Sequence, residues 1–157
     1  MRGGEVRIVE FDQGLAPAFA ALNYEWIAES YEIEPHDREI LDYPFEAIIA
    51  KGGQIFFALD GEVPVGTVAM IDRDPESFEL CKMAVAPNDQ GKGIGKKLLS
   101  ACVEYAKNKG KKAVVLESNT RQSAAIHLYR AFGFADLPLD PNSAYKRANV
   151  RMRLALS

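Results

Sequence analysis

The stretch that most constrains the fold is PNDQGKGIGKKLL, residues 87–99, in which Gly91, Gly93 and Gly95 stand directly before a helical pattern. Glycine weakens a helix start and costs chain entropy, so three glycines within five residues need a physical reason. Such a run fits a turn from a strand into a helix, where the backbone approaches a bulky anionic group at the helix N-terminus. The sequence therefore predicts a strand–turn–helix unit at this point.

Two familiar phosphate-binding patterns do not fit this stretch. A P-loop needs GxxxxGK followed by Ser or Thr, but here Lys97 follows Gly95 and Lys96, and position 90 is not glycine. A dinucleotide fingerprint needs GxGxxG near the first strand, whereas this run follows the fourth predicted strand. The remaining interpretation is a strand–turn–helix unit whose backbone N–H groups converge at the helix N-terminus and hold a pyrophosphate, with Lys92 and Lys96 adding charge. A plain glycine-rich turn that only begins the helix is the open alternative.

The periodicity of the rest of the chain predicts alternating strands and helices. Residues 54–71 are two β-rich runs around Asp60-Gly61, which indicates a hairpin, and DRDPES at 72–77 is a further turn. The predicted order is strand 6–11, helix 17–30, a helical stretch 37–51 broken by Pro44, the hairpin, strand 78–85, helix 94–108, strand 113–116, a helix ending at Gly133, and strand 149–156. The fold class is α/β (α+β), with one domain over residues 1–157 and a mixed sheet covered by helices on both faces.

Composition excludes several classes of protein. The chain has 157 residues, of which 48% are hydrophobic and 26% charged, and its formal charge is −3, so we expect no nucleic-acid partner. No run reaches the roughly 18 apolar residues of a membrane helix, and the N-terminus has no apolar signal region, so we expect no membrane association. Cys81 and Cys102 have no metal-binding spacing, which indicates reduced thiols in a cytoplasmic protein without a metal.

Two motifs carry a family resemblance. Gln90, Gly91, Lys92, Gly93, Ile94 and Gly95 match the pattern Q/R-x-x-G-x-G/A, and residues 128–134, LYRAFGF, match LY-x-x-x-GF. The strand VVLESN lies between the two motifs. The chain resembles the GNAT superfamily of N-acetyltransferases, which bind acetyl-coenzyme A. The resemblance spans nearly the whole chain, and its specific motifs lie within about 79–134.

The resemblance implies a particular sheet and cofactor site. The fourth strand should splay from the fifth in a mixed, mostly antiparallel sheet, and pantetheine should pair with the exposed backbone near Met83 and Val85. Many relatives carry Asn seven residues before the tyrosine, where this chain has Gln122, so either Gln122 or Asn119 is expected to contact coenzyme A. The implied cofactor residues are Met83, Ala84, Val85, Gln90, Gly91, Lys92, Gly93, Ile94, Gly95, Lys96, Asn119, Gln122 and Tyr129.

The resemblance also implies two catalytic residues. Tyr129 fits the family's proton donor to the departing thiolate, and its alternative reading is a core aromatic residue. Glu79 stands where some relatives keep a base, and its alternative reading is a solvated carboxylate. Strand alternation predicts that Glu79, Cys81, Met83 and Val85 share one face, with Phe78, Leu80 and Ala84 on the other.

By resemblance, the protein moves an acetyl group from acetyl-coenzyme A to a primary amine of a small molecule or amino acid, by direct attack in a ternary complex. Two alternatives remain open. One is an N-acetyltransferase of proteins or peptides, and the other is a non-catalytic regulatory module that binds coenzyme A. A homodimer is one assembly to test. The sequence does not identify the acceptor.

Overall fold

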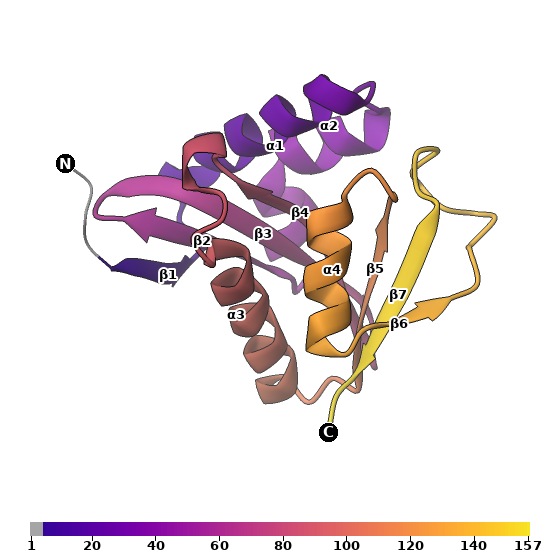
Figure 1. Cartoon of the computed structure of the whole chain (residues 1–157). Coiled ribbons are helices and arrows are strands. Elements are labelled where there is room, and N and C mark those ends of the chain that lie inside the picture. Colours follow the sequence, from indigo (N-terminus) through magenta and orange to yellow (C-terminus); the bar gives the residue numbers. More distant parts are fainter. Residues whose placement is uncertain (1–4) are drawn as a thin grey trace.

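The structure, a computed structural model, describes residues 5–157 and is built on one twisted sheet (Figure 1). The strands are β1 (Val6–Glu10), β2 (Gln54–Asp60), β3 (Val63–Asp74), β4 (Ser77–Val85), β5 (Ala113–Ser118), β6 (Ala135–Leu137) and β7 (Val150–Ala155). The helices are α1 (Ala16–Ser30), α2 (Pro35–Asp42), α3 (Ile94–Asn108) and α4 (Ser123–Phe132), with short turns η1 (Gln13–Leu15), η2 (Phe45–Ile49) and η3 (Pro87–Asp89). Within residues 5–157, each helix is too short or too polar to cross a membrane.

The sheet has the predicted mixed character. Its strand order is β1-β2-β3-β4-β5-β7-β6, in which β4 and β5 are parallel and the other neighbours are antiparallel. The parallel pairing joins Ser77–Leu80 to Ala113–Leu116 and then ends. Residues 81–85 of β4 continue beside β3 but form no ladder with β5 in the described chain. The predicted splay between the fourth and fifth strands is therefore confirmed.

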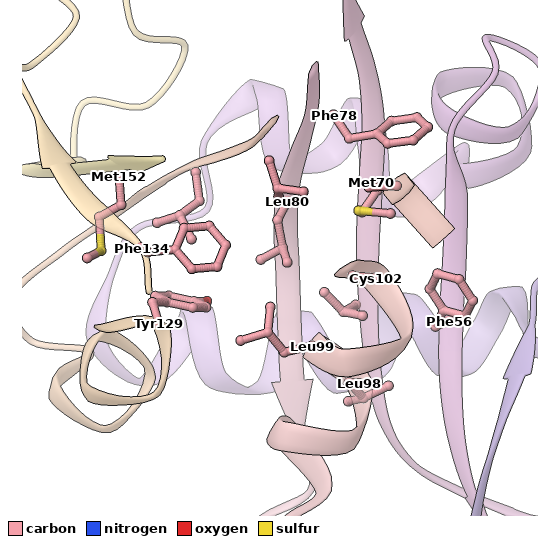
Figure 2. Packing of buried hydrophobic residues seen from close by; sticks show 14 of the residues in the cluster. Phe56, Met70, Phe78, Leu80, Leu98, Leu99, Cys102, Tyr129, Phe134 and Met152 are labelled. Atoms are coloured by element: carbon pink, nitrogen blue, oxygen red, sulfur yellow. The ribbon is translucent and has the colours of Figure 1, made fainter. Parts of the chain in front are cut away.

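Helices cover both faces of the sheet, as predicted. One hydrophobic cluster joins α3 and α4 to the sheet, and it extends from Met152 on β7 to Phe56 on β2 (Figure 2). The second cluster packs α1, α2 and η2 against the opposite face, around Phe19 and Phe57. Figure 1 shows α3 and α4 on the near side of the sheet and α1 and α2 behind it. Each apolar helix stripe thus buries its surface against the sheet, which is the main source of stability in such a layered fold.

Two local predictions about the strands need correction. The hairpin turn is Gly61-Glu62 rather than Asp60-Gly61, because Asp60 still pairs with Val63 and Gly61 takes the positive φ of +65°. The stretch 72–77 is mostly strand, since β3 runs to Asp74 and only residues 75–76 turn. The Asp74 carboxylate accepts hydrogen bonds from the backbone N–H groups of residues 76 and 77, both at 2.8 Å, and this tightens the turn.

The second helical stretch is divided as Pro44 indicated. Helix α2 ends at Asp42, and η2 begins at Phe45 as a single wide turn. Helix α2 starts two residues earlier than predicted because Glu34 and Asp37 form a capping box, in which each side chain accepts from the other's backbone N–H. This box places Asp37 at the beginning of α2, pointing toward β4.

Candidate functional site

A cavity opens where β4 and β5 separate. Its volume is about 90 Å³, and we call it the first cavity. Strand β4 contributes Leu80–Met83, and α4 contributes Tyr129. The other lining residues come from α1, the ends of β5 and α4, and the loop before β7: Trp26, Tyr31, Glu117, Ser118, Asn119, Gln122, Ala125, Tyr145, Arg147 and Ala148. We call the gap between the separated ends of β4 and β5 the split. The cavity passes through the split, from the side of α4 to the side that faces α1 and α2.

A bulge in β4 shapes the floor of this cavity. Lys82 has φ +54°, the only positive φ of a non-glycine residue among residues 5–157. Thr67 pairs with Ala84 and Ala69 pairs with Cys81, so two residues of β4 oppose one residue of β3. A bulky residue with positive φ is strained, and such strain persists only where the surrounding structure enforces it. Here the side chain of Lys82 supplies that enforcement, because it is buried in an ion-pair cluster.

The bulge overturns the predicted alternation along β4. Cys81 packs toward the α1 and α2 cluster, as expected for its face. Met83 and Val85 instead pack toward the α3 and α4 cluster, where Phe78 and Leu80 also lie. The extra residue shifts the alternation by one position, so the prediction that Glu79 and Met83 share a face is wrong.

The glycine run forms an open turn at the N-terminus of α3. Gly91 and Gly93 both have φ +80°, and an added Cβ at either would meet no described atom within 4 Å. Gly93 is the N-cap residue, and no side chain from residues 5–157 caps the helix. The first N–H groups of α3 are therefore free of intrahelical partners and point out of the helix end. Gly95 differs: it lies inside the helix, and a Cβ there would stand 3.3 Å from Leu128.

The other polar residues of the run lie beside this turn. Gln90 donates its amide to the carbonyl oxygen of Val85 at 3.2 Å, which ties the turn to the end of β4. Lys92 is exposed and reaches Asp89 at 3.3 Å. Lys96 is exposed on the first turn of α3. Ile94 is buried in the core, so its predicted contact with a cofactor can come only from its backbone.

Tyr129 is a buried residue that reaches the first cavity. Its ring is buried beside Phe134, at 5.6 Å between centroids, in the part of the core between β7 and β4 (Figure 2). The residue also lines the first cavity, and its hydroxyl forms no hydrogen bond within residues 5–157. Burial raises the pKa of this phenol well above its usual value, so the hydroxyl keeps its proton at neutral pH.

Asn119 and Gln122 both line the first cavity, and each also has a partner in the protein. Asn119 donates to the carbonyl oxygen of Arg147 at 2.6 Å and accepts from the N–H of Arg121 at 2.9 Å. Gln122 donates to the hydroxyl of Tyr31 at 3.4 Å. The amide of Gln122 is the more weakly held of the two, because its hydrogen bond is long.

Glu79 lies apart from Tyr129 and Met83. It lines a second cavity of about 300 Å³, together with His36, Arg73, Glu117 and residues of the loop before β7. Its carboxylate has no hydrogen bond or ion pair within residues 5–157. Burial raises its pKa, and the nearby charge of Glu117 adds to that rise. The structure therefore brings Met83, Asn119, Gln122 and Tyr129 to one cavity and places Glu79 in the next.

A buried cluster of charges fills the side of the split that faces α2. Lys82 Nζ lies 2.6 Å from Asp37 Oδ1, with side-chain exposures of 2% and 0%. Arg147 donates to both oxygens of Asp37 at 2.9 and 2.7 Å and reaches Glu34 at 3.3 Å. Burial alone would raise the pKa of Asp37, but the hydrogen bonds from Arg147 and Lys82 outweigh it and hold that pKa well below its usual range. Burial also lowers the pKa of Lys82, which Asp37 opposes.

Sequence reasoning missed this cluster. Lys82 interrupts the apolar second half of its strand, and a lysine flanked by cysteine and methionine was a signal that it needs a buried partner. Asp37 stands at the third position of a capped helix, where an acidic residue is ordinary. Arg147 lies in a loop and gave no signal at all.

Comparison with known proteins gives a consistent result. Residues 20–134 match the sequence pattern of the family described as "Acetyltransferase (GNAT) family". N-acetyltransferase 8B of Rattus norvegicus is 35% identical over 89 residues, which cover 54% of this chain and 40% of that protein. The L-amino acid N-acyltransferase MnaT of Escherichia coli is 40% identical over 50 residues, covering 32% of this chain and 29% of that protein. The matched segments thus span well under half the length of these relatives.

Solved structures share the fold. A GNAT-family acetyltransferase from Staphylococcus aureus Mu50 superposes with a TM-score of 0.88 at 20% identity, covering 98% of this chain and all of that one. The acetyltransferase yncA of Salmonella typhimurium, solved with its cofactor acetyl-CoA, superposes with a TM-score of 0.78 at 24% identity, covering 98% of this chain and 95% of that one.

Proposed function

The chain belongs to the GNAT family of acetyltransferases, and on that premise we propose that it transfers an acetyl group from acetyl-coenzyme A to a primary amine of a small molecule or amino acid. The transfer takes place by direct attack in a ternary complex. The observation that carries the proposal is the cavity at the split, which brings the free hydroxyl of Tyr129 to the exposed edge of β4 at Met83.

In this proposal the bound cofactor extends from the split to the glycine turn at the start of α3. Backbone N–H groups of residues 90–95 hold the pyrophosphate, and the free donors at the start of α3 fit an anion of that kind. The open space at Gly91 and Gly93 lets the phosphates approach, while Lys92 and Lys96 add positive charge. Met83, Ala84 and Val85 offer their backbone to the pantetheine arm, and Gln122 or Asn119 contacts it from the opposite side.

The reaction forms a bond from the acceptor nitrogen to the acetyl carbon and breaks the carbon–sulfur bond. Negative charge develops on the carbonyl oxygen, and a backbone N–H near Met83 stabilises it. The sulfur leaves with the bonding electron pair and takes a proton from Tyr129, which recovers one from solvent. The nitrogen releases a proton as the amide forms. We assign that proton to Glu79 through water, since Glu79 stands in the adjoining cavity.

A small acceptor suits the site. The first cavity is only about 90 Å³, and polar and aromatic side chains close its acceptor end. The relative MnaT is named for acyl transfer to L-amino acids, which supports an acceptor of similar size. An acceptor on a protein or peptide would need a longer open groove leading to the same point.

A thiol-release assay tests the proposal. Acetyl-coenzyme A is mixed with the protein and a panel of simple amines, amino acids and short peptides, and free thiol is followed. The proposal predicts turnover with at least one small amine, reduced by roughly 10²-fold in Tyr129→Phe while binding of acetyl-coenzyme A is kept. Turnover with peptides alone would favour the peptide N-acetyltransferase. Binding of acetyl-coenzyme A without turnover on the whole panel would favour a regulatory module and contradict the proposal.

We extend the proposal to the domain organisation, the cellular location and the oligomeric state of the protein. Residues 1–157 form one N-acetyltransferase domain. The thiols of Cys81 and Cys102 are free, which supports a cytoplasmic location. Sedimentation analysis distinguishes a monomer from a homodimer.

A further inference from the structure

The two cavities adjoin at two residues. Tyr145 and Glu117 are the residues that line both the first and the second cavity, and we call this pair the wall. Tyr145 comes from the loop before β7, and Glu117 comes from the end of β5. An acceptor held in the first cavity would have to pass the wall to extend into the larger second cavity.

The ring of Tyr145 is held from several sides. Its hydroxyl accepts a hydrogen bond from Lys82 Nζ at 2.7 Å, and Lys82 is fixed in turn by Asp37. The guanidinium of Arg147 lies 4.6 Å from the ring centroid, and the His36 ring meets it edge-on at 4.9 Å. A side chain held by this many partners does not swing aside without disrupting the buried charges.

The two parts of the wall are also joined to each other. Ser143 Oγ donates a hydrogen bond to the carboxylate of Glu117 and accepts one from the N–H of Tyr145 at 3.1 Å. One serine therefore connects the backbone of Tyr145 to the end of β5. The wall is a single connected structure across the base of the acceptor side.

We propose that Tyr145 is a specificity-determining residue whose ring ends the acceptor site and restricts the enzyme to short amines. This inference rests on the proposed function. In this proposal the buried charges of Lys82, Asp37 and Arg147 hold the ring of Tyr145 in place. The second cavity, with Glu79, Arg73 and His36, then becomes available to an acceptor only when the ring is removed.

Two substitutions separate the ring from its hydroxyl. Tyr145→Ala removes the ring and joins the two cavities. Tyr145→Phe keeps the ring and its contacts with Arg147 and His36, and it removes only the hydrogen bond from Lys82. If the ring is the barrier, only the alanine variant changes the tolerated length of the acceptor.

The first test measures kcat/KM for glycinamide, glycylglycinamide and glycylglycylglycinamide, which share a reacting amine and differ in length. The wild type should prefer glycinamide, and Tyr145→Ala should raise the ratio of the longest to the shortest acceptor by about 10-fold or more, as expected when steric exclusion is relieved. Tyr145→Phe should keep the wild-type ratio. An unchanged ratio in Tyr145→Ala, or an equal rise in Tyr145→Phe, would overturn the proposal.

A second test does not depend on turnover. Cys81 lines the first cavity, whereas Cys102 is buried in the core. With desulfo-coenzyme A filling the cofactor side, we compare alkylation of Cys81 by iodoacetamide and by fluorescein maleimide, read by mass spectrometry. Both reagents need the thiolate, so the pKa of Cys81, which burial raises to about 12, slows both alike.

The ratio of large to small reagent should rise at least about 10-fold in Tyr145→Ala and stay at the wild-type value in Tyr145→Phe. Equal ratios in the three proteins would contradict a closed wall. If no glycinamide is acetylated but the labelling ratio rises as expected, the wall stands and the proposed amine chemistry fails.

Discussion

The two sides of the split between β4 and β5 are made from different parts of the chain. On the α3 side, the exposed groups are backbone N–H donors at the helix start and glycines with positive φ. On the α2 side, the groups are charged side chains buried around Asp37. The first surface is formed by neighbours in sequence, and the second joins segments that are far apart. Substitutions should therefore affect the two sides differently: the α2 side through stability, and the α3 side through ligand affinity.

The largest effect is expected on the α2 side. Asp37→Ala leaves Lys82 buried without its carboxylate and Arg147 with only Glu34. Breaking a buried pair by removing one partner costs roughly 3–5 kcal/mol of unfolding free energy. For a chain of this length, the melting temperature should fall by about 10 °C or more, measured by calorimetry.

The control for this change is Asp136→Ala, which removes the partner of Arg130 in an exposed ion pair at 2.9 Å. Exposed pairs contribute about 1 kcal/mol or less. Similar losses in Asp37→Ala and Asp136→Ala would show that the buried charges do not stabilise the α2 side.

The next largest effect is expected on kcat, from a change at Tyr129, which lies where the two sides of the split meet. Tyr129→Phe keeps the packing against Phe134 and removes a hydroxyl without a described protein partner, so the melting temperature should stay unchanged. If the hydroxyl protonates the departing thiolate, kcat should fall by roughly 10²-fold with little change in acetyl-coenzyme A affinity. Tyr105→Phe, the same change on α3 and outside the first cavity, should leave kcat unchanged. Equal kcat values in the two variants would reduce Tyr129 to a packing role.

A smaller effect is expected on acetyl-coenzyme A affinity, and it should distinguish the N-terminal end of α3 from its C-terminal end. Gly93 and Gly110 flank the two ends of α3 with φ +80° and +75°, and both have open space for a Cβ within the described structure. Alanine at either position should cost about 1–2 kcal/mol of stability, because an L-residue is strained at positive φ. Only Gly93→Ala should weaken acetyl-coenzyme A binding, by about 10-fold in titration calorimetry, which corresponds to ~1.4 kcal/mol. Equal affinities in the two variants would remove the glycine turn from the binding site.

The smallest effect concerns pH and Glu79. A carboxyl whose pKa is raised on folding binds its proton more tightly in the native state, so its contribution to stability falls as pH rises through the window above its ordinary pKa. Glu79→Gln removes this dependence. The variant should be more stable than the wild type at pH 7, and the two should converge near pH 4, because protonation of the wild-type carboxyl removes the cost of burying its charge.

Urea unfolding at the two pH values measures this difference. Glu62→Gln, on the exposed hairpin, is the matched control for replacing a carboxylate by an amide. A Glu79→Gln variant that loses stability at pH 7 would mean that the carboxylate is held by a favourable partner.

The difference between the α3 side, formed by neighbours in sequence, and the α2 side, formed by distant segments, also explains what the sequence could predict. The order of elements along the chain and the helix at 94–108 followed from local periodicity. The splay was implied by the family resemblance, which rests on two motifs that are each complete within a few residues. The α2 side could not be predicted in this way. Lys82 pairs with Asp37 across 45 positions and with Tyr145 across 63, and Arg147 reaches Asp37 across 110. No local pattern records such pairings.

The bulge shows the same limit within one strand. Simple alternation placed Met83 on the face of Glu79, but Lys82 adopts a positive φ that its residue type disfavours. The conformation is held by a distant ion pair, so it is invisible to propensity and alternation. One residue of bulge was enough to separate Glu79 from the cavity that contains Tyr129 and Met83.

Cofactor binding at the split and the glycine turn is tested most directly by a titration of the ¹⁵N-labelled protein with acetyl-coenzyme A, followed residue by residue in amide NMR spectra. Large shifts are expected for the amides of residues 83–85 and 90–95, where the strand edge is open and the helix N-terminus is free. Residues 77–79, where β4 is still paired with β5, should shift little. Shifts confined to other surfaces, with residues 83–95 unchanged, would contradict the claim that the split and the glycine turn bind the cofactor.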